Sequence, residues 1–478
     1  MKRPSFFQRL ASGARFVFGG SGNYESARRE PTRSEILYQH PSDAREEISA
    51  LDRDSILRVG RSLEKNSGFF REIQLCNSIY SVGDGMRPQP RSSDAAWNAK
   101  ARAWFSAETA FPEITGRFPM WKVQDIVCRL LDSDGEVFAI HAENENGRPK
   151  LQFMEAHRLS RRTDASRGIA DGIRFSKWGK PVSYFFRDGE VETEVSAADV
   201  IHVFSAGRFS ETRGVSPAQH AFNDIRDGRD LDAIEKATDK HVSGFGLVVT
   251  SAAAASDDEG FDDPFTAAAS GGSACAASVA DAPFRRIAGA QAPVMKPGEE
   301  VKVLESNRPS PAWLGLRAAI DNAAALGNVP LGFLSDPSKL GGASTRLVVG
   351  KAARLFSRRQ QELISQFLDK AWLFFIGWAI AHGELDAPEG WWRVEWTTPR
   401  KLTVDNGRDA SQIREDIRAG LYPVEDDYAE RGLDFADELR AKADLVAEVQ
   451  RVCAEKGVDP ALILPVIFAE KRESTPKQ

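Results

Sequence analysis

Cysteine and histidine are scarce in this 478-residue sequence, and neither forms a recognisable metal-binding pattern. The sequence has no CxxC motif and no HExxH motif, and its cysteines are widely spaced, at Cys76, Cys128, Cys275 and Cys453. This spacing argues against a zinc centre and against a disulfide framework, and it favours a reducing compartment. We therefore expect neither a metal nor a cofactor.

Long hydrophobic runs and an excess of basic residues are also missing. The most apolar run, AWLFFIGWAIA at 371–381, is about half of the roughly 20 residues that span a bilayer, so we interpret it as a core or interface helix. The basic N-terminus lacks the apolar segment of a secretory signal and is expected to be a disordered or partner-bound arm. The formal net charge of −6 argues against static, tight binding of nucleic acid. The charge does not exclude a protein through which DNA passes without being bound tightly.

Hydrophobic periodicity predicts helices near the N-terminus and strands after them. The helical pattern over 42–82 is interrupted at Asn66-Ser67-Gly68, which predicts two helices joined by a turn. Further helices are expected over 95–107 and 120–133, and the DSDGE segment at 132–136 is expected to be a turn rather than a calcium loop. An antiparallel or mixed sheet is predicted from β-rich runs at 135–143, 149–159, 172–186 and 199–204.

A helix that starts at Ser216-Pro217 is predicted to run to about 244, and its composition is unusual. Apolar residues are few, while Asp and Arg occur on nearly every face, so the helix has no wide stripe for a monomer core. It suits a position between copies of the chain or beside a solvated channel. The Ala/Ser/Gly/Asp-rich segment 251–283 is expected to be a surface excursion or a loop ordered by a partner. Later elements are a helix at 311–326, a long helix at about 345–382, a strand at 391–399 and a helical C-terminal segment.

The stretch LGFLSDPSKLGGASTR at 331–346 precedes Gly350-Lys351 and looks at first like a phosphate-binding loop. A Walker A loop needs GxxxxGK followed by Ser or Thr, because its backbone amides cradle the phosphates and the hydroxyl holds magnesium. Here Thr345 replaces the first glycine, Ala352 replaces the hydroxyl residue, and no strand precedes the loop. Since the sequence also lacks a GxSxG motif and a placed Cys/His pair, we expect no catalytic residues and no enzyme.

The same loop offers hydrogen-bond donors of the kind that touch phosphate backbones without reading bases. An ordinary connection between helices has about 2–8 residues, and longer loops inside compact chains are often functional. The donors are Ser335, Ser338, Lys339, Ser344, Thr345 and Arg346.

Several motifs resemble those of the lambda-type portal proteins of tailed bacteriophages. They are GIRFSKWGKPVSYFF at 172–186, DVIHVFSAGRFSETRGVSP at 199–217, MKPGEEVKVLESNRPSP at 295–311 and ALGNVPLGFLSD at 325–336. They stand in the family's order within about residues 30–400. One departure is the sequence Gly341-Gly342-Ala343-Ser344-Thr345-Arg346, because the family commonly has an Asn-Tyr-Ser-Ser-x-Arg type sequence there. The arginine and the hydroxyls survive, but the aromatic residue is lost, which leaves any role of that aromatic residue unsupported here.

The resemblance implies an α+β portal fold with a helical stem, a mixed α/β wing, a small clip and a helical C-terminal crown, in a ring oligomer. Carried over segment by segment, it predicts a flexible N-terminal arm at 1–30, a wing at 31–214, a first stem helix at 215–245, a clip at 246–310, a second stem helix at 311–327, a tunnel loop at 328–345, a long wing helix and strand at 346–404, and a crown at 405–478.

The function that the resemblance implies is that of a portal at the capsid vertex of a virion. Double-stranded DNA would be packaged and ejected through a homo-oligomeric ring, normally of twelve subunits, which assembles in the host cytoplasm. Expected partners are the terminase large subunit, the major capsid protein or a scaffold, and a head-tail adaptor, with no membrane. The alternatives are another non-catalytic head-tail adaptor or scaffold ring, and a nucleotide-driven DNA translocase, which the failed Walker A motif disfavours.

Two sets of residues are predicted to face the DNA. The tunnel-loop contacts would be Ser338, Lys339, Ser344 and Arg346. The acidic residues expected on a low-friction channel wall are Asp224, Asp227, Asp230, Glu235 and Asp239. Few salt bridges to phosphate would form along such a wall, so DNA would not be held as it moves.

Overall fold

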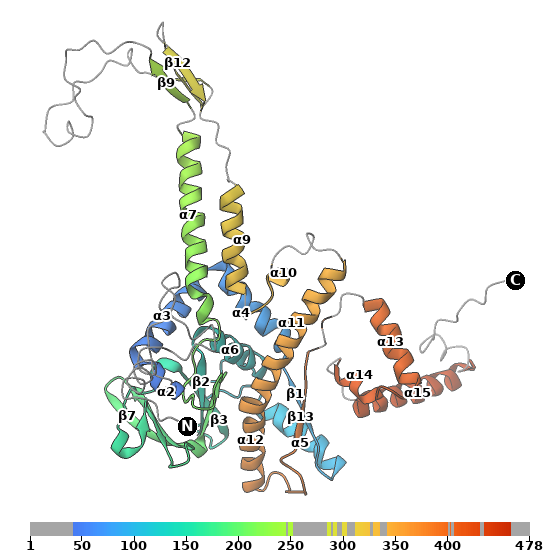
Figure 1. Cartoon of the computed structure of the whole chain (residues 1–478). Helices are drawn as coiled ribbons and strands as arrows, with labels where there is room; N and C mark the ends of the chain where they lie inside the picture. Colours follow the sequence, from blue (N-terminus) through green and yellow to red (C-terminus); the bar gives the residue numbers. More distant parts are fainter. Residues whose placement is uncertain are drawn as a thin grey trace, which may run out of the picture.

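A mixed α/β body carries a projecting pair of helices in the computed structural model (Figure 1). The structure describes residues 42–244, 247–251, 284–287, 290–293, 299–303, 311–325, 328–334, 342–399, 402, 406–430 and 435–459. The predicted arm at 1–30 lies outside these residues, as does nearly all of the segment 251–283. The predicted α+β class is confirmed.

The first part of the body is helical, as predicted. Its helices are α2 (Ala44–Glu47), α3 (Ala50–Asn66), α4 (Gly68–Ser81), α5 (Ala95–Glu108) and α6 (Met120–Ser133). The predicted break between α3 and α4 is present at Ser67, whose hydroxyl accepts a hydrogen bond from the Phe70 amide at 3.3 Å. Ser67 thus ends one helix and caps the next, as its side-chain oxygen predicts.

Two antiparallel sheets and one two-stranded ladder complete the body. The first sheet has the order β3-β2-β8, and the second has the order β4-β5-β6-β7. Their strands are β2 (Glu136–Glu143), β3 (Pro149–Glu155), β8 (Val200–Phe204), β4 (Ile169–Ala170), β5 (Ile173–Phe175), β6 (Pro181–Asp188) and β7 (Val191–Ser196). The ladder joins β1 (Arg87–Pro90), which local periodicity did not predict, to β13 (Val394–Thr397), which lies within the strand predicted at 391–399. The predicted DSDGE turn is shorter than expected, because Asp132 and Ser133 still belong to α6.

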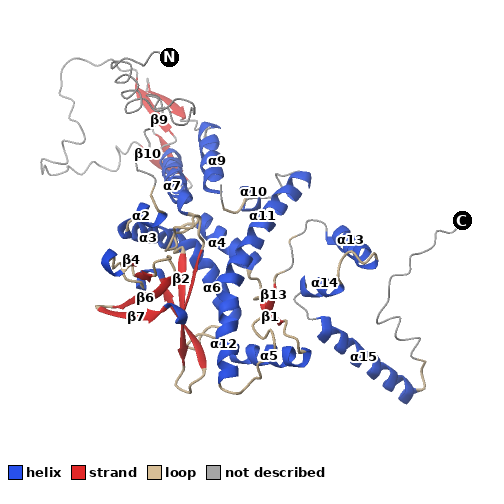
Figure 2. Ribbon diagram, turned by 60° about the horizontal axis from the view of Figure 1, so that its bottom comes forward, coloured by secondary structure: helices blue, strands red, loops and turns tan. Residues whose placement is uncertain are grey.

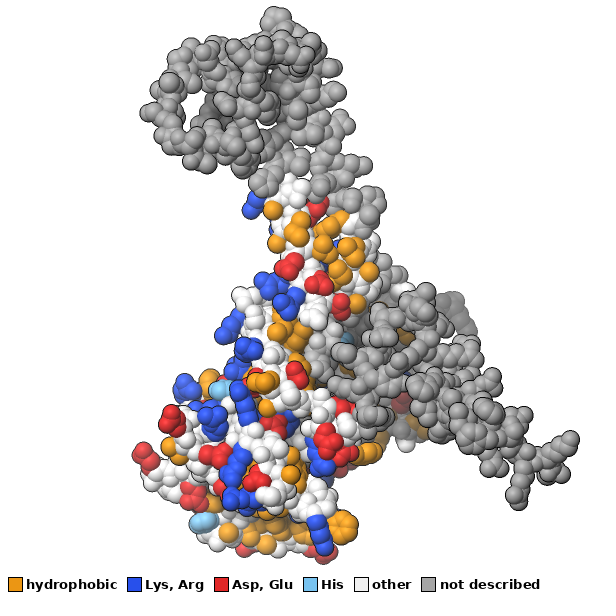
Figure 3. All heavy atoms as spheres, turned by 60° about the vertical axis from the view of Figure 1, so that its left-hand side comes forward, with side chains coloured by type: hydrophobic (Ala, Val, Ile, Leu, Met, Phe, Trp, Pro, Cys, Tyr) orange, Lys and Arg blue, Asp and Glu red, His pale blue; other side chains and the backbone are white. Residues whose placement is uncertain are grey.

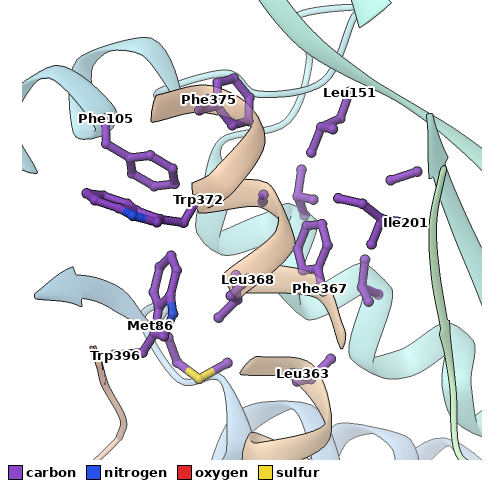
Figure 4. Packing of buried hydrophobic residues seen from close by; sticks show 14 of the residues in the cluster. Met86, Phe105, Leu151, Ile201, Leu363, Phe367, Leu368, Trp372, Phe375 and Trp396 are labelled. Carbon is purple, nitrogen blue, oxygen red and sulfur yellow. The ribbon is translucent and has the colours of Figure 1, made fainter. Parts of the chain in front are cut away.

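A long helix runs through the largest hydrophobic cluster. It consists of α11 (Gly342–Leu363), a π-helical segment η8 (Ile364–Leu368) and α12 (Asp369–Ala381). Phe367, Trp372 and Phe375 are fully buried, and the Phe105 ring from α5 packs against Trp372 with centroids 5.2 Å apart (Figure 4). The stretch Ser344–Ala381 is long and apolar enough to cross a membrane by length and composition. Since its side chains fill this cluster, we interpret it as a core helix.

The projecting pair consists of α7 (Phe222–Gly244) and α9 (Pro311–Ala325). Helix α7 begins later than the predicted Ser216, because Ser216 is used in a turn before it. The Ser216 hydroxyl accepts from the Ala218 amide at 3.1 Å and donates to the Asp132 carbonyl at 2.5 Å, and a short 3-10 helix, η5 (Gln219–Ala221), follows. Beyond the pair lie two antiparallel ladders, β9 (Leu247–Ser251) with β12 (Glu299–Val303) and β10 (Phe284–Ile287) with β11 (Ala290–Pro293).

The C-terminal segment is helical, as predicted, and its helices lie to one side of the body (Figure 2). They are α13 (Asn406–Arg418), α14 (Val424–Glu430) and α15 (Phe435–Lys456). Tyr428 and Phe435 join α14 to α15, with ring centroids 5.4 Å apart.

Candidate functional site

The α7–α9 pair is held by an apolar foot and an ion-pair group higher up. At the foot, Phe222 packs edge-on against Phe70 of α4, with centroids 5.4 Å apart, and Ile225 and Ala324 are buried beside them. Higher up, Arg317 of α9 reaches Asp232 of α7 at 3.4 Å and Asp321 of its own helix at 3.0 Å. A Cβ at Gly228 would lie 2.4 Å from the Arg317 guanidinium, so a larger residue there would force the guanidinium to shift.

The five acidic residues predicted for a channel wall do not share one face of α7. Asp227, Asp230 and Asp239 are exposed, whereas Asp224 and Glu235 are half-buried. At about 100° per residue, Asp224, Glu235 and Asp239 fall on the side that carries Asp232 and faces α9. Asp227 and Asp230 fall on the far side. The sequence therefore located the acidic helix, and its helical spacing divides these acids between two faces. The position of α9 decides which of the two faces is covered.

The exposed cations of α7 do share a face. Its exposed basic residues, Arg226, Arg229, Lys236 and Lys240, fall within an arc of about 80° on a helical wheel. Lys and Arg side chains gather near the foot of the helix pair in Figure 3. This basic face lies between the α9-facing side and the side of Asp227 and Asp230. The sequence analysis placed charged residues on nearly every face of this helix and did not assign its cations to one face, although their spacing would have allowed it.

The predicted tunnel-loop residues divide between a loop and a helix. Ser338 and Lys339 lie outside the described residues. Ser344 and Arg346 are exposed in the first turns of α11, which begins at Gly342, earlier than the predicted helix. Before the loop, α10 (Leu331–Leu334) is anchored by Phe333, whose ring lies 5.2 Å from Tyr80 and 5.6 Å from Phe356. Both ends of the loop are thus fixed to the body.

The Gly350-Lys351 dipeptide lies within α11, several residues after its start. Ala352, at the position where a Walker A loop has its hydroxyl, is fully buried in a hydrophobic cluster with Ile73 and Phe356. Helical backbone at these residues has its amides turned into the helix rather than toward a phosphate. The sequence-based rejection of a nucleotide site therefore gains a geometric reason. In the part of the chain that the structure describes, no group of three or more His, Cys, Asp or Glu side chains is placed to hold a metal ion.

A buried charged cluster at the foot of the helix pair was missed by sequence reasoning. Glu136, at the start of β2, is fully buried, and its carboxylate accepts from Arg213 at 2.5 and 2.8 Å and from the Gly214 amide at 2.8 Å. His202 Nε2 lies 3.1 Å from the same carboxylate. Burial alone would raise the pKa of Glu136, but Arg213 and His202 hold it well below its usual range. The cluster joins two strands to the segment that leads into α7.

The backbone at this cluster approaches so closely that two glycines are required. A Cβ at Gly214 would lie 2.3 Å from the Gly135 carbonyl oxygen, and Gly135 has a φ of +87° with Val215 backbone atoms equally near. Burial lowers the pKa of His202, so the ring is neutral and its Nε2–H donates to Glu136. The Arg-Gly pair of the TRGVSP segment is the sequence signal that could have indicated this site.

A second buried ion pair connects α6 to α11. Arg359 donates to Asp132 at 2.7 Å, and Asn77 of α4 donates to the other carboxylate oxygen at 2.9 Å. The backbone carbonyl of Asp132 is the acceptor for Ser216, so one residue contacts both the long helix and the entry to α7. Burial raises the pKa of Asp132, against the opposing attraction of Arg359. The helix that follows the loop is thereby tied to the foot of the projecting pair.

The fold places a projecting helix pair and a small β region on a mixed α/β body, with buried ion pairs at the foot of the pair. A family model described as phage portal protein, lambda family, matches residues 32–360, which is more than half of the chain. The chain is a portal protein, a component of the capsid vertex of tailed phages and related particles. It belongs to the lambda family of phage portal proteins, and the predicted resemblance is confirmed.

The solved structures that match this chain include three with TM-scores below 0.5. The neck of an empty gene transfer agent particle matches with a TM-score of 0.48 and 15% identity, covering 80% of this chain and 94% of that chain. The virion of the native gene transfer agent particle matches with a TM-score of 0.45 and 15% identity, covering 80% and 93%. An HK97-family phage portal protein from Corynebacterium diphtheriae matches with a TM-score of 0.32 and 12% identity, covering 61% and 84%. No curated protein gives a significant sequence match.

Proposed function

We propose that this portal protein assembles into a ring, normally of twelve copies, that conducts double-stranded DNA at packaging and ejection without chemistry of its own. Membership of the lambda portal family over residues 32–360 is the observation that carries the proposal. The α7–α9 pair would form the stem, the β9–β12 and β10–β11 ladders part of the clip, the body the wing, and α13–α15 the crown. The clip would dock the terminase large subunit and later a head-tail adaptor, and the capsid or scaffold would hold the outside of the ring.

The structure supports a conduit in two ways. The projecting α7 is heavily charged and largely exposed in one copy, as expected of a helix that is completed by neighbours or borders a solvated channel. The Gly350-Lys351 dipeptide lies inside helix α11 rather than in a loop, and the adjacent Ala352 is buried, which favours an external motor over ATP hydrolysis by this chain.

Electron microscopy of the purified full-length protein tests the proposal directly. We expect closed rings with an axial channel wide enough for a DNA duplex to pass. An ATPase assay with added DNA serves as the companion measurement and should show no DNA-stimulated hydrolysis. A protein that stays monomeric, or rings with a channel too narrow for a duplex, would contradict the conduit function.

Lys339→Glu is expected to lower DNA packaging or retention severalfold while ring assembly stays intact. The change reverses one charge in each subunit at the loop proposed to reach the channel, so weak phosphate contacts around the ring become repulsive. Lys351→Glu is the matched control, because it makes the same substitution at an exposed residue of α11. Packaged DNA protected from nuclease provides the measurement. Normal packaging and retention with Lys339→Glu would remove this loop from the DNA path.

A further inference from the structure

Among the side chains that the structure describes, the upper part of the α7–α9 pair has no fully buried hydrophobic residue. The buried apolar residues of the pair lie at its foot, where Phe222, Ile225, Ala324 and Ala325 meet the body. Helix α7 has 23 residues and therefore extends for roughly 34 Å, most of it beyond this foot. Higher up, Leu231, Trp313 and Ile320 are only half-buried, and the ion pairs of Arg317 add little, so the two helices gain limited stability from each other. The upper pair therefore calls for a further packing partner.

Helix α9 presents an uncharged face on the side away from α7. Its two charged residues, Arg317 and Asp321, are both engaged in the ion-pair group with Asp232. Every exposed residue of α9 is uncharged: Leu314, Gly315, Leu316, Ala318, Ala319 and Asn322. Leu314 and Leu316 are each 51% exposed and lie at the two opposite edges of this face, with Gly315, Ala319 and Asn322 between them. Hydrophobic side chains gather on the upper part of the pair in Figure 3.

Helix α7 carries a small apolar patch on the opposite side of the pair, with the exposed Asp230 on the same face about one turn below it. Ile234 is 62% exposed, and Ala233 and Ala237 beside it are also exposed. On a helical wheel these three residues fall within about 100° of one another, on the far side from Asp232 and α9. Because Asp232 contacts Arg317, the Ile234 patch lies at a similar height to Leu314 and Leu316.

We propose that the uncharged face of α9 in one copy packs against the Ile234 patch of α7 in the next copy. This inference rests on the proposed ring. Two different apolar surfaces on opposite sides of one element make a head-to-tail contact, which repeats around a closed ring. A face without cations offers little to DNA phosphates, so a second copy fits it better than nucleic acid does. Gly315 agrees with this arrangement, since nothing in its own chain lies within 4 Å of an added Cβ and a neighbouring helix can approach closely there.

A disulfide test distinguishes this contact from other arrangements in the ring. The variant Ile234→Cys/Ala319→Cys is expected to form, on mild oxidation, a ladder of covalent multimers above the dimer. In the matched control, Lys236→Cys/Ala319→Cys, the α7 cysteine sits about 160° around the helix from position 234, so little product is expected. Both variants carry Cys275→Ser. The native thiols of Cys76 and Cys128 are unreactive because burial raises the pKa of each to about 12, and Cys453 is buried.

Each outcome decides between the contact and the ring itself. Covalent multimers above the dimer that form with Ile234→Cys/Ala319→Cys and not with the control variant support the contact. Rings in the microscope with no ladder, equal products from both variants, or a product that stops at the dimer would overturn the contact and leave the proposed function standing. Absence of rings from the unmodified protein would overturn the proposed function and the contact together. As a second variant, Leu316→Lys is expected to reduce the ring fraction at least tenfold with an unchanged circular dichroism spectrum, and intact rings would oppose the contact.

Discussion

Arg213→Met is expected to destabilise the body by about 3–5 kcal/mol, because it leaves the Glu136 carboxylate buried without its main counter-charge. Water cannot compensate for this loss, because the Glu136 side chain is fully buried. Arg213 donates at least two of the hydrogen bonds that the carboxylate accepts. His202 and the Gly214 amide alone cannot replace a guanidinium. Urea unfolding of the purified protein, followed by tryptophan fluorescence, measures the change.

Two further variants make this result specific. Arg208→Met removes an arginine close in sequence whose side chain is half-exposed in an ion pair with Glu47, so its effect should stay within about 1 kcal/mol. Glu136→Gln/Arg213→Met removes both charges and should recover much of the loss, since no isolated charge remains buried. If Arg213→Met unfolds at the same urea concentration as the unmodified protein, the cluster does not stabilise the body.

Local sequence patterns predicted the elements of this fold better than the contacts between them. The bounds of α6 and the break at Ser67 follow from helical periodicity and from a capping side chain, both of which act within a few residues. The start of α7 was placed at Ser216, because sequence alone does not reveal that the hydroxyl is bound to the Asp132 carbonyl, far away in the chain. Strand β1 and its pairing with β13 were missed for the same reason, because the two strands are far apart in the sequence.

The candidate site shows the same division between local and distant information. The rejected Walker A motif depended on residue identity at Thr345 and Ala352, so it could be judged from sequence. The acids of α7 were recognisable as a group, and helical spacing alone divides them between two faces. Which face is covered depends on α9, which follows a long intervening segment and could not be placed from the sequence. Buried charges such as Glu136 look like any surface acid in a sequence, because only tertiary packing removes their water.

Arg359→Met is expected to destabilise the protein by about 3–5 kcal/mol at neutral pH, and the loss should shrink in acid. Asp132 is buried, and without Arg359 its carboxylate keeps only the Asn77 hydrogen bond. The folded-state pKa of Asp132, already raised by burial, should rise further, while the unfolded value stays near 3.9. A group whose folded pKa lies above its unfolded pKa stabilises the fold below the unfolded value and loses this contribution as pH rises through the folded value.

The neighbouring residue provides the control for this pH dependence. Arg358→Met changes an exposed arginine one position earlier, which pairs with Glu362 along the same helix, so its effect should be within about 0.5 kcal/mol and nearly independent of pH. Asp132→Asn/Arg359→Met should also lose the pH dependence, because no titrating group remains there. Urea unfolding between pH 4 and pH 8 compares the three variants. This range runs upward from the ordinary pKa of an aspartate, about 3.9. A pH-independent loss in Arg359→Met would mean that Asp132 does not carry the buried charge, and that α11 is held to the foot of α7 by packing alone.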